Sequence, residues 1–513
     1  MTRKSLIAAG LAVVVVSATA CGGGGGTAGA PTGSDRPVTV AIAVEPVSLD
    51  PCDTQDATNA IVVRGNVTES LTRIDPENGT VVGLLAESWE QKDPTTWVFT
   101  LKSGVTFQDG APFDATAAAT SITRLLDPEL NCQNLDQFPQ TMTLTAVDAT
   151  TLQVTTPEPD PILPLRISYA DISSPNTPAD SKTSSPIGTG PFSFVSSSQG
   201  QSIQLKRNDS YWGDAPEATA VTYLFRAEPS VRAGMARTGE ASIASAIAVQ
   251  DATDDDRTRE YNDNRVFFLR TQTDRAPFDD IRVRQAVAYA IDKNTIVQAL
   301  MERSGTPTDQ IITSTVNGFV PGYTAPVFDP AKAKSLIAEA AADGVAVTTE
   351  FDLVTRPDLF PGADEVIQAI VQNLQQVGLN VKIVSLDTDA WLQLLRAPFP
   401  PDQRPTIVAI SHDNVSGDAS FTFPKYMASD GTNSTIRSPE IDDLLARADV
   451  AGGEERAALY QQANAFEQQE VAAMIPIASQ SKLMMLAEGI EYQPNSLSGV
   501  ELRIADVHFT TDN

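Results

Sequence analysis

The first twenty residues of the chain determine where its body can fold. Arg3 and Lys4 form a basic start, and Leu6–Val16 is an apolar run of eleven residues. A few small residues then lead to Cys21. An apolar run of this length is too short for a permanent membrane-spanning helix and is typical of a secretory signal peptide. The sequence therefore predicts that residues 1–20 are removed on export and that the body folds outside the cytoplasm.

The residues around Cys21 resemble the lipobox of a bacterial lipoprotein, in which the cysteine becomes the lipid-modified first residue. The motif is Ala-Thr-Ala-Cys, with Ala18 where a leucine is usual. Residues 21–36 are rich in Gly, Thr, Ala, Pro and Ser, which is typical of a flexible tether. We expect Cys21 to be lipidated, and an ordinary signal peptide cut nearby is the alternative. No other segment reaches eighteen apolar residues, so no further membrane span is predicted.

Composition excludes several classes of function. The chain has 36 Lys+Arg and 65 Asp+Glu, a net charge of −29, which becomes −31 when the leader and its two basic residues are removed. Such an acidic body repels phosphate backbones, so we expect no nucleic-acid partner. Two histidines in 513 residues argue against a multi-histidine metal centre, and we expect neither a metal nor a cofactor. The 42% of hydrophobic residues is ample for packed cores and argues against disorder.

Two cysteines remain in the body if Cys21 carries lipid. Cys52 and Cys132 form an even pair in an oxidising compartment, which makes them a candidate disulfide. Two separate free thiols are the alternative.

Helix and strand signals alternate along the body. Alternating apolar residues predict strands at 38–44, 97–101 and 379–383. Capping residues or apolar stripes predict helices at 114–126, 329–344 and 366–377, and one that begins at Ser438 with Ile441, Leu444, Leu445 and Ala448 on its inner face. This interleaving indicates an α/β architecture with layered sheets.

Enzyme signatures are sparse. Gly188-Thr-Gly190 lacks the third glycine of a dinucleotide site and is typical of a turn before Pro191. Ser479-Gln-Ser-Lys482 matches the S-x-x-K of serine acyltransferases but has no S-D-N or K-T-G partner. No H-E-x-x-H, P-loop or G-x-S-x-G motif occurs. A non-enzymatic exported protein is therefore favoured.

Four blocks of sequence share one resemblance. They are Gly83-Leu-Leu-Ala-Glu-Ser-Trp89 with Trp97–Gly110 and Pro112-Phe113; Pro186-Ile-Gly-Thr-Gly-Pro-Phe192 with Tyr211-Trp-Gly213; Pro277–Ala286 with Ala290-Ile-Asp292; and Pro439-Glu-Ile-Asp442 with a helix that is expected to end near Ile475-Pro476. Together they resemble the extracellular solute-binding proteins of the peptide/nickel class (family 5), which serve ATP-binding-cassette (ABC) importers and include dipeptide- and oligopeptide-binding lipoproteins.

The resemblance implies an α/β, two-lobed periplasmic-binding-protein-like fold of the class II type, with a hinge and an extra subdomain inserted in lobe I. The implied boundaries are 37–58, 185–271 and 480–513 for lobe I, 59–184 for the inserted subdomain and 272–479 for lobe II. Cys52 and Cys132 would then join the early segment to the inserted subdomain.

The resemblance also implies a ligand held between the lobes. In dipeptide-binding relatives an Arg-Pro before the long lobe II helix binds the peptide carboxylate, and Arg356-Pro357 occupies that place. An acidic residue after a lobe II strand binds the ammonium group. The corresponding loop begins Ser411-His412-Asp413 and reaches Asp418, so both aspartates are candidates. A buried charge needs a partner of opposite charge, and an arginine can donate two parallel hydrogen bonds to one carboxylate.

The loop departs from the pattern of the relatives. Their usual Gly-Trp before the acidic cluster is Ser411-His412 here, and their Asp-Pro is Asp418-Ala419; the loss of the Trp weakens a specific dipeptide assignment. A second departure is Leu269-Arg-Thr271, where an Asn commonly begins the strand near the hinge. We expect a lipid-anchored monomer on the extracytoplasmic face of the bacterial membrane that delivers peptides to permease and ATPase subunits. The alternatives are another solute (a sugar, opine, siderophore or nickel chelate), a cell-envelope enzyme or a ligand sensor.

Overall fold

The computed structural model of the chain describes residues 36–76, 79–139, 141–324, 326–357, 359–401, 403–414, 417–495 and 502–510. The predicted signal peptide, Cys21 and nearly all of the predicted tether lie outside the described residues. Arg36–Asp512 forms the unit considered below. None of the helices in the described ranges is both long and apolar enough to cross a bilayer.

One mixed sheet of eleven strands runs through the body. Its order is β15-β14-β16-β12-β17-β11-β1-β10-β9-β8, and β13 pairs with β17 beside this path. The strands are β1 (Pro37–Ile42), β8 (Phe192–Ser198), β9 (Ser202–Arg207), β10 (Ala220–Phe225), β11 (Ile243–Ala244), β12 (Thr258–Thr271), β13 (Gly305–Pro307), β14 (Phe351–Thr355), β15 (Val381–Ser385), β16 (Thr406–Asp413) and β17 (Met474–Leu486).

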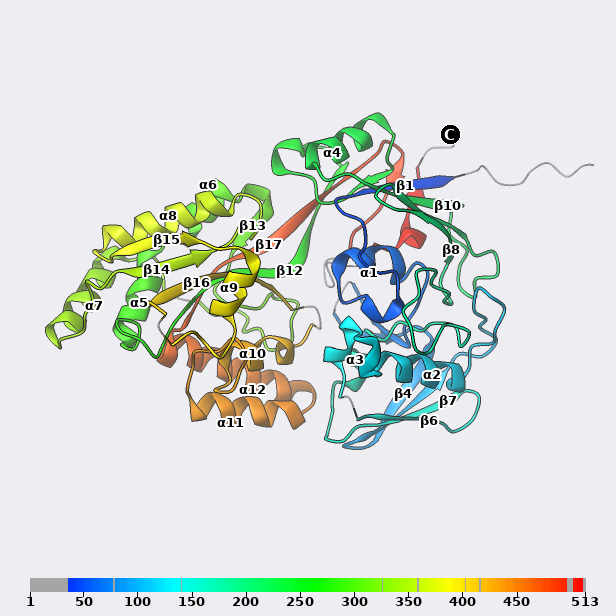
Figure 1. The fold of residues 1–513 in the computed structure, drawn as a ribbon, viewed down its shortest axis with the longest axis horizontal. Helices are drawn as coiled ribbons and strands as arrows, with labels where there is room; N and C mark the ends of the chain where they lie inside the picture. Colours follow the sequence, from blue (N-terminus) through cyan, green and yellow to red (C-terminus); the bar gives the residue numbers. More distant parts are fainter. Residues whose placement is uncertain are drawn as a thin grey trace, which may run out of the picture. The chain divides into compact units, whose positions relative to one another are not determined.

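Two long antiparallel strands join the halves of this sheet. β12 has 14 residues and β17 has 13, and they pair from Thr258↔Met485 to Arg270↔Met474 with a break in register between Asn262 and Val266. Figure 1 shows both strands passing from the half that contains β14–β16 to the half that contains β1 and β10. We call the first half lobe II and the second half lobe I. These two strands therefore carry the chain across the hinge of a two-lobed fold.

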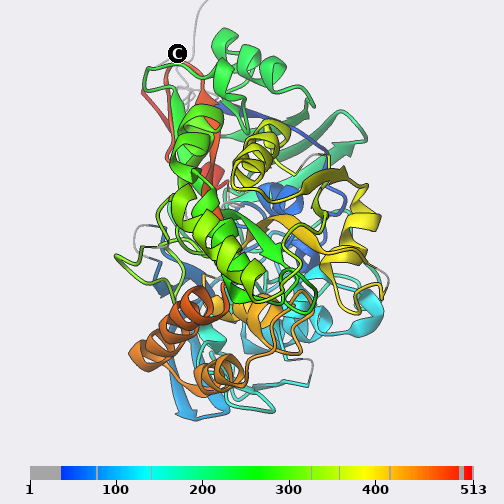
Figure 2. The same cartoon turned by 90° about the vertical axis from the view of Figure 1, so that its left-hand side faces the viewer.

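Side-chain alternation in β12 builds two cores in lobe II. Phe267 and Leu269 face one core with α5–α8, while Val266 and Phe268 face another with α9–α12. Figure 2 shows the α11–α12 pair side by side. The helices are α5 (Ile281–Ala290), α6 (Lys293–Leu300), α7 (Pro330–Ala342), α8 (Ala363–Gln376), α9 (Thr388–Leu395), α10 (Phe423–Met427), α11 (Pro439–Val450) and α12 (Gly453–Phe466). Lobe II is thus a sheet covered on both faces by helices.

Lobe I has a core of its own and carries a second sheet. Val38, Val40 and Ile42 of β1 pack with α1 (Ala57–Val63) and with the C-terminal segment at Leu502. α4 (Pro229–Thr238) contacts β11 and β17. The second sheet has the order β4-β5-β7-β6, and it lies with α2 and α3 in one apolar core. The remaining elements are α2 (Ala115–Leu125), α3 (Leu163–Ile167), β2 (Thr72–Ile74), β3 (Val81–Gly83), β4 (Ala86–Asp93), β5 (Thr96–Leu101), β6 (Thr143–Ala146), β7 (Thr151–Thr155), β18 (Ile490–Glu491) and β19 (His508–Phe509).

Helix starts agree with the capping residues read from the sequence. The side chain of Asp114 accepts a hydrogen bond from the Ala117 N–H, and Ser438 caps α11 through the Ile441 N–H. The four expected inner residues of α11 are all buried. Because a cap satisfies backbone donors that the helix itself leaves open, it fixes where the helix begins.

The strand predicted after α8 is present, but it begins at Val381 rather than Leu379, and its Ile383 is 37% exposed, so alternation there does not mark a buried face. One expectation about elements was wrong. Ile475-Pro476 is not the end of a helix: α12 ends at Phe466, a π-turn follows, and both residues lie in β17. The apolar residues near Pro476 belong to a central strand, where long-range pairing decides the structure.

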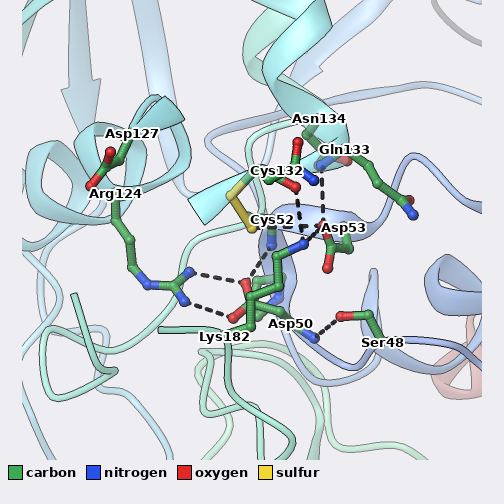
Figure 3. The surroundings of a disulfide bond; sticks show 12 residues. Ser48, Asp50, Cys52, Asp53, Arg124, Asp127, Cys132, Gln133, Asn134 and Lys182 are labelled. Atoms are coloured by element: carbon green, nitrogen blue, oxygen red, sulfur yellow. Dashed lines mark hydrogen bonds and ion pairs between the residues drawn. A yellow bond between two sulfur atoms is a disulfide. The ribbon is translucent and has the colours of Figure 1, made fainter. Parts of the chain in front are cut away.

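A disulfide joins Cys52 and Cys132, whose Cα atoms lie 5.3 Å apart (Figure 3). Charged side chains surround it: Arg124 donates to both oxygens of Asp50 at 2.9 and 2.7 Å, and the Lys182 ammonium donates to Asp53 at 2.8 Å. Cys52 belongs to the short helix at Pro51–Asp53, and Cys132 precedes the short helix at Gln133–Gln137. The bridge therefore links the segment after β1 to the part of the chain around the second sheet.

Removing this disulfide in a Cys52→Ala/Cys132→Ala variant is expected to lower the free energy of unfolding by about 2–5 kcal/mol. The bridge spans 80 residues of sequence, so it restricts the unfolded chain strongly. Denaturant unfolding of the oxidised protein, the reduced protein and the variant measures the difference. Equal stabilities in all three would contradict a structural role for the bridge.

Candidate ligand-binding site

The parallel pairing of β14 with β16 brings two predicted site segments to one edge of the sheet. Val354 pairs with Val408, so the carboxyl end of β14, which leads into Arg356, lies beside the carboxyl end of β16. Ser411, His412 and Asp413 are the last residues of β16. In open α/β sheets, loops at the carboxyl ends of parallel strands form ligand sites. The positions predicted for the carboxylate and ammonium contacts therefore share an edge.

The Arg356 side chain packs against an aromatic ring, and its Nε–H has no partner among the described residues. Its guanidinium carbon lies 5.2 Å from the ring centroid of Trp391 in α9. The Trp391 indole N–H in turn donates to the Ala409 carbonyl of β16 at 3.3 Å. The buried Nε of Arg356 has no hydrogen-bond partner in the described part of the chain. A buried donor left unpaired is costly, so this group is ready to bind an acceptor.

Buried Arg270 anchors the helix that supports Arg356. It donates to the carbonyls of Leu394 and Leu395 at the end of α9, and to that of Asn433. Desolvation by burial lowers the pKa of Arg270 to about 10, which keeps it charged at neutral pH. A cation at the carboxyl end of a helix is favourable because the helix dipole is negative there. Arg270, which lies in the segment that departs from the family pattern, thus positions α9 and its Trp391.

Asp413 lies at the end of β16 and remains partly accessible. Its register partner on β12 is Arg265, whose Nη2 lies 2.9 Å from Asp413 Oδ2. The two side chains are 27% and 36% exposed respectively, so this ion pair is solvated and weak. Arg265 also lies 3.6 Å from Asp263, which gives it a second carboxylate. An incoming ammonium group can therefore compete for Asp413 without leaving a buried charge alone.

Asp418 has a different environment. Its carboxylate accepts two hydrogen bonds in parallel from Arg456, Nε to Oδ2 at 3.0 Å and Nη2 to Oδ1 at 2.8 Å. Asn317 and the Ser420 N–H also donate to it. Both side chains of the ion pair are almost fully buried, at 1% and 2% exposure. Asp418 is thus occupied inside lobe II and is poorly placed to meet a ligand.

His412 and Ser411 are packed against protein groups. The imidazole stacks on Phe421 with ring centroids 5.7 Å apart, contacts Tyr426 and shares a hydrogen bond with Thr422 at 3.0 Å. Burial lowers the pKa of His412 to about 4, so the ring is neutral at pH 7. Ser411 donates to the Gln480 side chain of β17. No group of three or more His, Cys, Asp and Glu side chains with metal-binding geometry occurs among the described residues.

A pocket in lobe I was missed by the sequence analysis. It is lined by charged and aromatic side chains on β2, near α1 and near α3, namely Arg64, Glu69, Arg73, Tyr169, Asp171 and Arg503. Three charged residues, Arg64, Glu69 and Arg73, fall within ten residues of a stretch that is otherwise largely buried. This clustering of charge is a signal that could have indicated the pocket. Tyr169, Asp171 and Arg503 reach the pocket only when the chain folds, so local sequence does not predict their part in it.

Replacing Asp418 by Asn is expected to lower the free energy of unfolding by roughly 3–5 kcal/mol, because Arg456 then stays buried without a carboxylate. Burial alone would raise the pKa of Asp418, but Arg456 outweighs it and holds the pKa below its usual range. The stability from this pair is therefore present above the ordinary carboxyl pKa and is lost as the pH falls through the lowered value.

The matched variant Asp413→Asn is expected to change stability by less than about 1 kcal/mol, since its ion pair is exposed. Urea unfolding of both variants at pH 7 and pH 3 makes the comparison. Equal effects of the two substitutions at pH 7 would contradict the structural assignment of Asp418.

The fold is shared with solved binding proteins. The substrate-binding protein CtaP of Listeria monocytogenes superposes with a TM-score of 0.81 at 19% identity, covering 93% of this chain and 100% of that one. A dipeptide-binding protein of Pseudoalteromonas sp. SM9913, in complex with Met-Leu, gives a TM-score of 0.73 at 20% identity over 92% of this chain and 100% of the other. Both show the two-lobed periplasmic binding fold.

Sequence comparison gives the family. The glutathione-binding protein GsiB of Pectobacterium atrosepticum is 25% identical over 401 residues, which is 75% of this chain and 74% of that protein. GsiB of Escherichia coli K12 is 24% identical over 433 residues, 80% and 82% of the two chains. The model of the bacterial extracellular solute-binding proteins, family 5, matches residues 80–429. The chain therefore belongs to the family 5 extracellular solute-binding proteins, which serve ABC importers.

Proposed function

We propose that this protein captures peptides between its two lobes and delivers them to the permease and ATPase subunits of an ABC importer. The observation that carries the proposal is the pairing of β14 with β16, which puts the open guanidinium of Arg356 and the accessible carboxylate of Asp413 at one edge. A free peptide ends in one carboxylate and one ammonium group. Each end then meets an opposite charge when the lobes close and exclude water.

The relatives support this class of ligand. Proteins named for glutathione, a tripeptide, are similar to this chain over three quarters or more of its length, and a solved protein of the same fold holds Met-Leu. Solved nickel-chelate binders share the fold too, but His412 stacks on Phe421, its Nε2 shares a hydrogen bond with Thr422, and a lone imidazole is a poor nickel site. We propose a binding role without catalysis, because the site groups carry the charges needed to hold the two ends of a peptide. The Thr422 hydroxyl, which shares a hydrogen bond with His412, is fully buried and not open to a substrate.

The same proposal divides the chain into two lobes. Lobe I comprises residues 37–58, 185–271 and 480–513, with 59–184 inserted, and lobe II comprises 272–479. Both transitions between lobes then fall in or beside the long strands, since β12 ends at Thr271 and β17 contains residue 480. The last residues of β12, from Val266 on, belong to lobe I by these bounds but pack in the lobe II cores, so the strand itself spans the hinge. We propose that Arg356 binds the ligand carboxylate, that Asp413 rather than Asp418 binds the ammonium group, and that the protein acts as a monomer.

Arg356→Ala is expected to weaken peptide binding by about 1.5–3 kcal/mol, as for loss of a charge-assisted hydrogen bond. Calorimetry with Met-Leu and with glutathione as probes measures it. Arg404→Ala is the matched control, because Arg404 precedes the amino end of β16, at the opposite edge of the same strands, and pairs with exposed Glu350. An equal loss in both variants would refute the role of Arg356, and absence of binding of either probe to the wild type would refute the peptide assignment.

We further propose that Cys21 anchors the protein to the outer face of the cell membrane through lipid. When the full-length gene is expressed in a bacterial host, the wild type is expected in the membrane fraction with its lipid-modified Cys21 detected by mass spectrometry. Cys21→Ser is expected to release the folded body or to leave the leader uncut. An unmodified, soluble wild-type protein would contradict the anchor.

A further inference from the structure

The lobe I pocket carries an excess of positive charge. Three arginines line it, Arg64, Arg73 and Arg503, against two carboxylates, Glu69 and Asp171. Its free volume is about 30 Å³, and a water molecule needs roughly 10–15 Å³ on the same measure. The pocket therefore has room for a small group such as a carboxylate and none for a whole peptide.

Both acids of the pocket are already engaged. Asp171 accepts hydrogen bonds from Arg64 at 3.0 Å and from Thr54 and Thr68, so this ion pair neutralises itself. The oxygens of Glu69 accept from three neutral donors, each at 2.8 Å, on Thr189, Tyr211 and Trp212. Burial raises the pKa of Glu69, and the hydrogen bonds from Trp212, Tyr211 and Thr189 oppose this shift. Asp171 is therefore committed to Arg64, and neither acid makes a hydrogen bond or an ion pair with Arg73 in the described part of the chain.

Arg73 is the group that these contacts do not satisfy. Its Nε is buried and lacks a hydrogen-bond partner among the described residues, and none of the described acids lies within ion-pair distance of it. Arg503 lies on the same pocket, with its side chain 20% exposed and its Nε 3.7 Å from Asp506. A buried donor without a partner is rare in native structures and energetically costly. An acceptor that enters the pocket would recover this cost.

One residue of the pocket lies against lobe II at Gly417, after β16. Ile74, which lines the pocket next to Arg73, has its Cδ1 3.9 Å from the position that a Cβ on Gly417 would take. Gly417 lies four residues after Asp413. The unpaired guanidinium of lobe I and the accessible carboxylate of lobe II therefore belong to segments that come into contact.

We propose that this pocket binds a second carboxylate of the ligand, with Arg73 as its main donor and Arg503 beside it. The preferred substrates are then peptides with an acidic side chain or another additional carboxylate. This inference rests on the proposed peptide function and refines it. Arginine suits the role because its planar fork can donate two parallel hydrogen bonds to one carboxylate.

The test compares two peptides that differ only in charge. Calorimetry at low ionic strength is expected to show that Ala-Glu binds the wild type at least tenfold more tightly than Ala-Gln. In Arg73→Gln this preference is expected to disappear while the affinity for Ala-Gln stays the same. Arg73→Lys keeps a charge and is expected to retain part of the preference. Arg447→Gln is the control, since Arg447 is 57% exposed on α11 and its loss removes the same charge.

The results distinguish a failure of the carboxylate subsite from a failure of the proposed peptide function. If Ala-Gln and Ala-Glu bind equally well, or if the preference survives in Arg73→Gln, the subsite is refuted and the peptide function stands. If neither peptide binds, the peptide function is refuted, and the pocket is tested with glutarate by thermal shift. A stabilisation by glutarate that is lost in Arg73→Gln but kept in Arg447→Gln supports the anion subsite, and no stabilisation of the wild type overturns it.

Discussion

The antiparallel pairing of β12 with β17 is the interaction on which the other parts of the structure depend. It places β17 between β12 and β11, so strands of both lobes are hydrogen-bonded into one sheet. The same pairing fixes which β12 residues face each helix layer of lobe II. Because a slip of one residue would exchange these faces, register here is set by two apolar cores at once. The pairing shifts register between Asn262 and Val266 and again between Phe267 and Phe268, and these are the points where this constraint is relaxed.

Buried charge has two opposite uses in this molecule. Asp418 and Arg456 satisfy each other and tie the loop after β16 to α12, so they specify structure. Arg356 and Arg73 each keep a buried nitrogen without a protein partner in the described regions, which leaves binding capacity. A satisfied pair and an unsatisfied donor can look alike in sequence: Arg456 lies within α12 and Arg73 within β2, and neither position reveals whether the side chain has a partner. The partner in space distinguishes structural from binding roles.

The local parts of the fold were predictable and the long-range parts were not. The helix caps Asp114 and Ser438 and the apolar stripe of α11 depend on residues within one or two helical turns. A short stretch of sequence is therefore enough to predict them. Pro476 was misplaced because its strand is defined by partners about 200 residues away. The choice between Asp413 and Asp418 stayed open because Arg456 lies 38 residues further along. The family resemblance indicated the edge that holds Arg356, whereas the lobe I pocket needs three distant segments together.

The position of β17 has a consequence for how the chain can acquire its structure. This strand is central to the sheet, yet it comes from residues 474–486 of 513. A chain that ends before Met474 leaves the facing edges of β11 and β12 without their shared neighbour, and such bare edges readily pair with other chains. The native hydrogen-bonded connection between the lobes therefore cannot form until the chain has been made as far as β17.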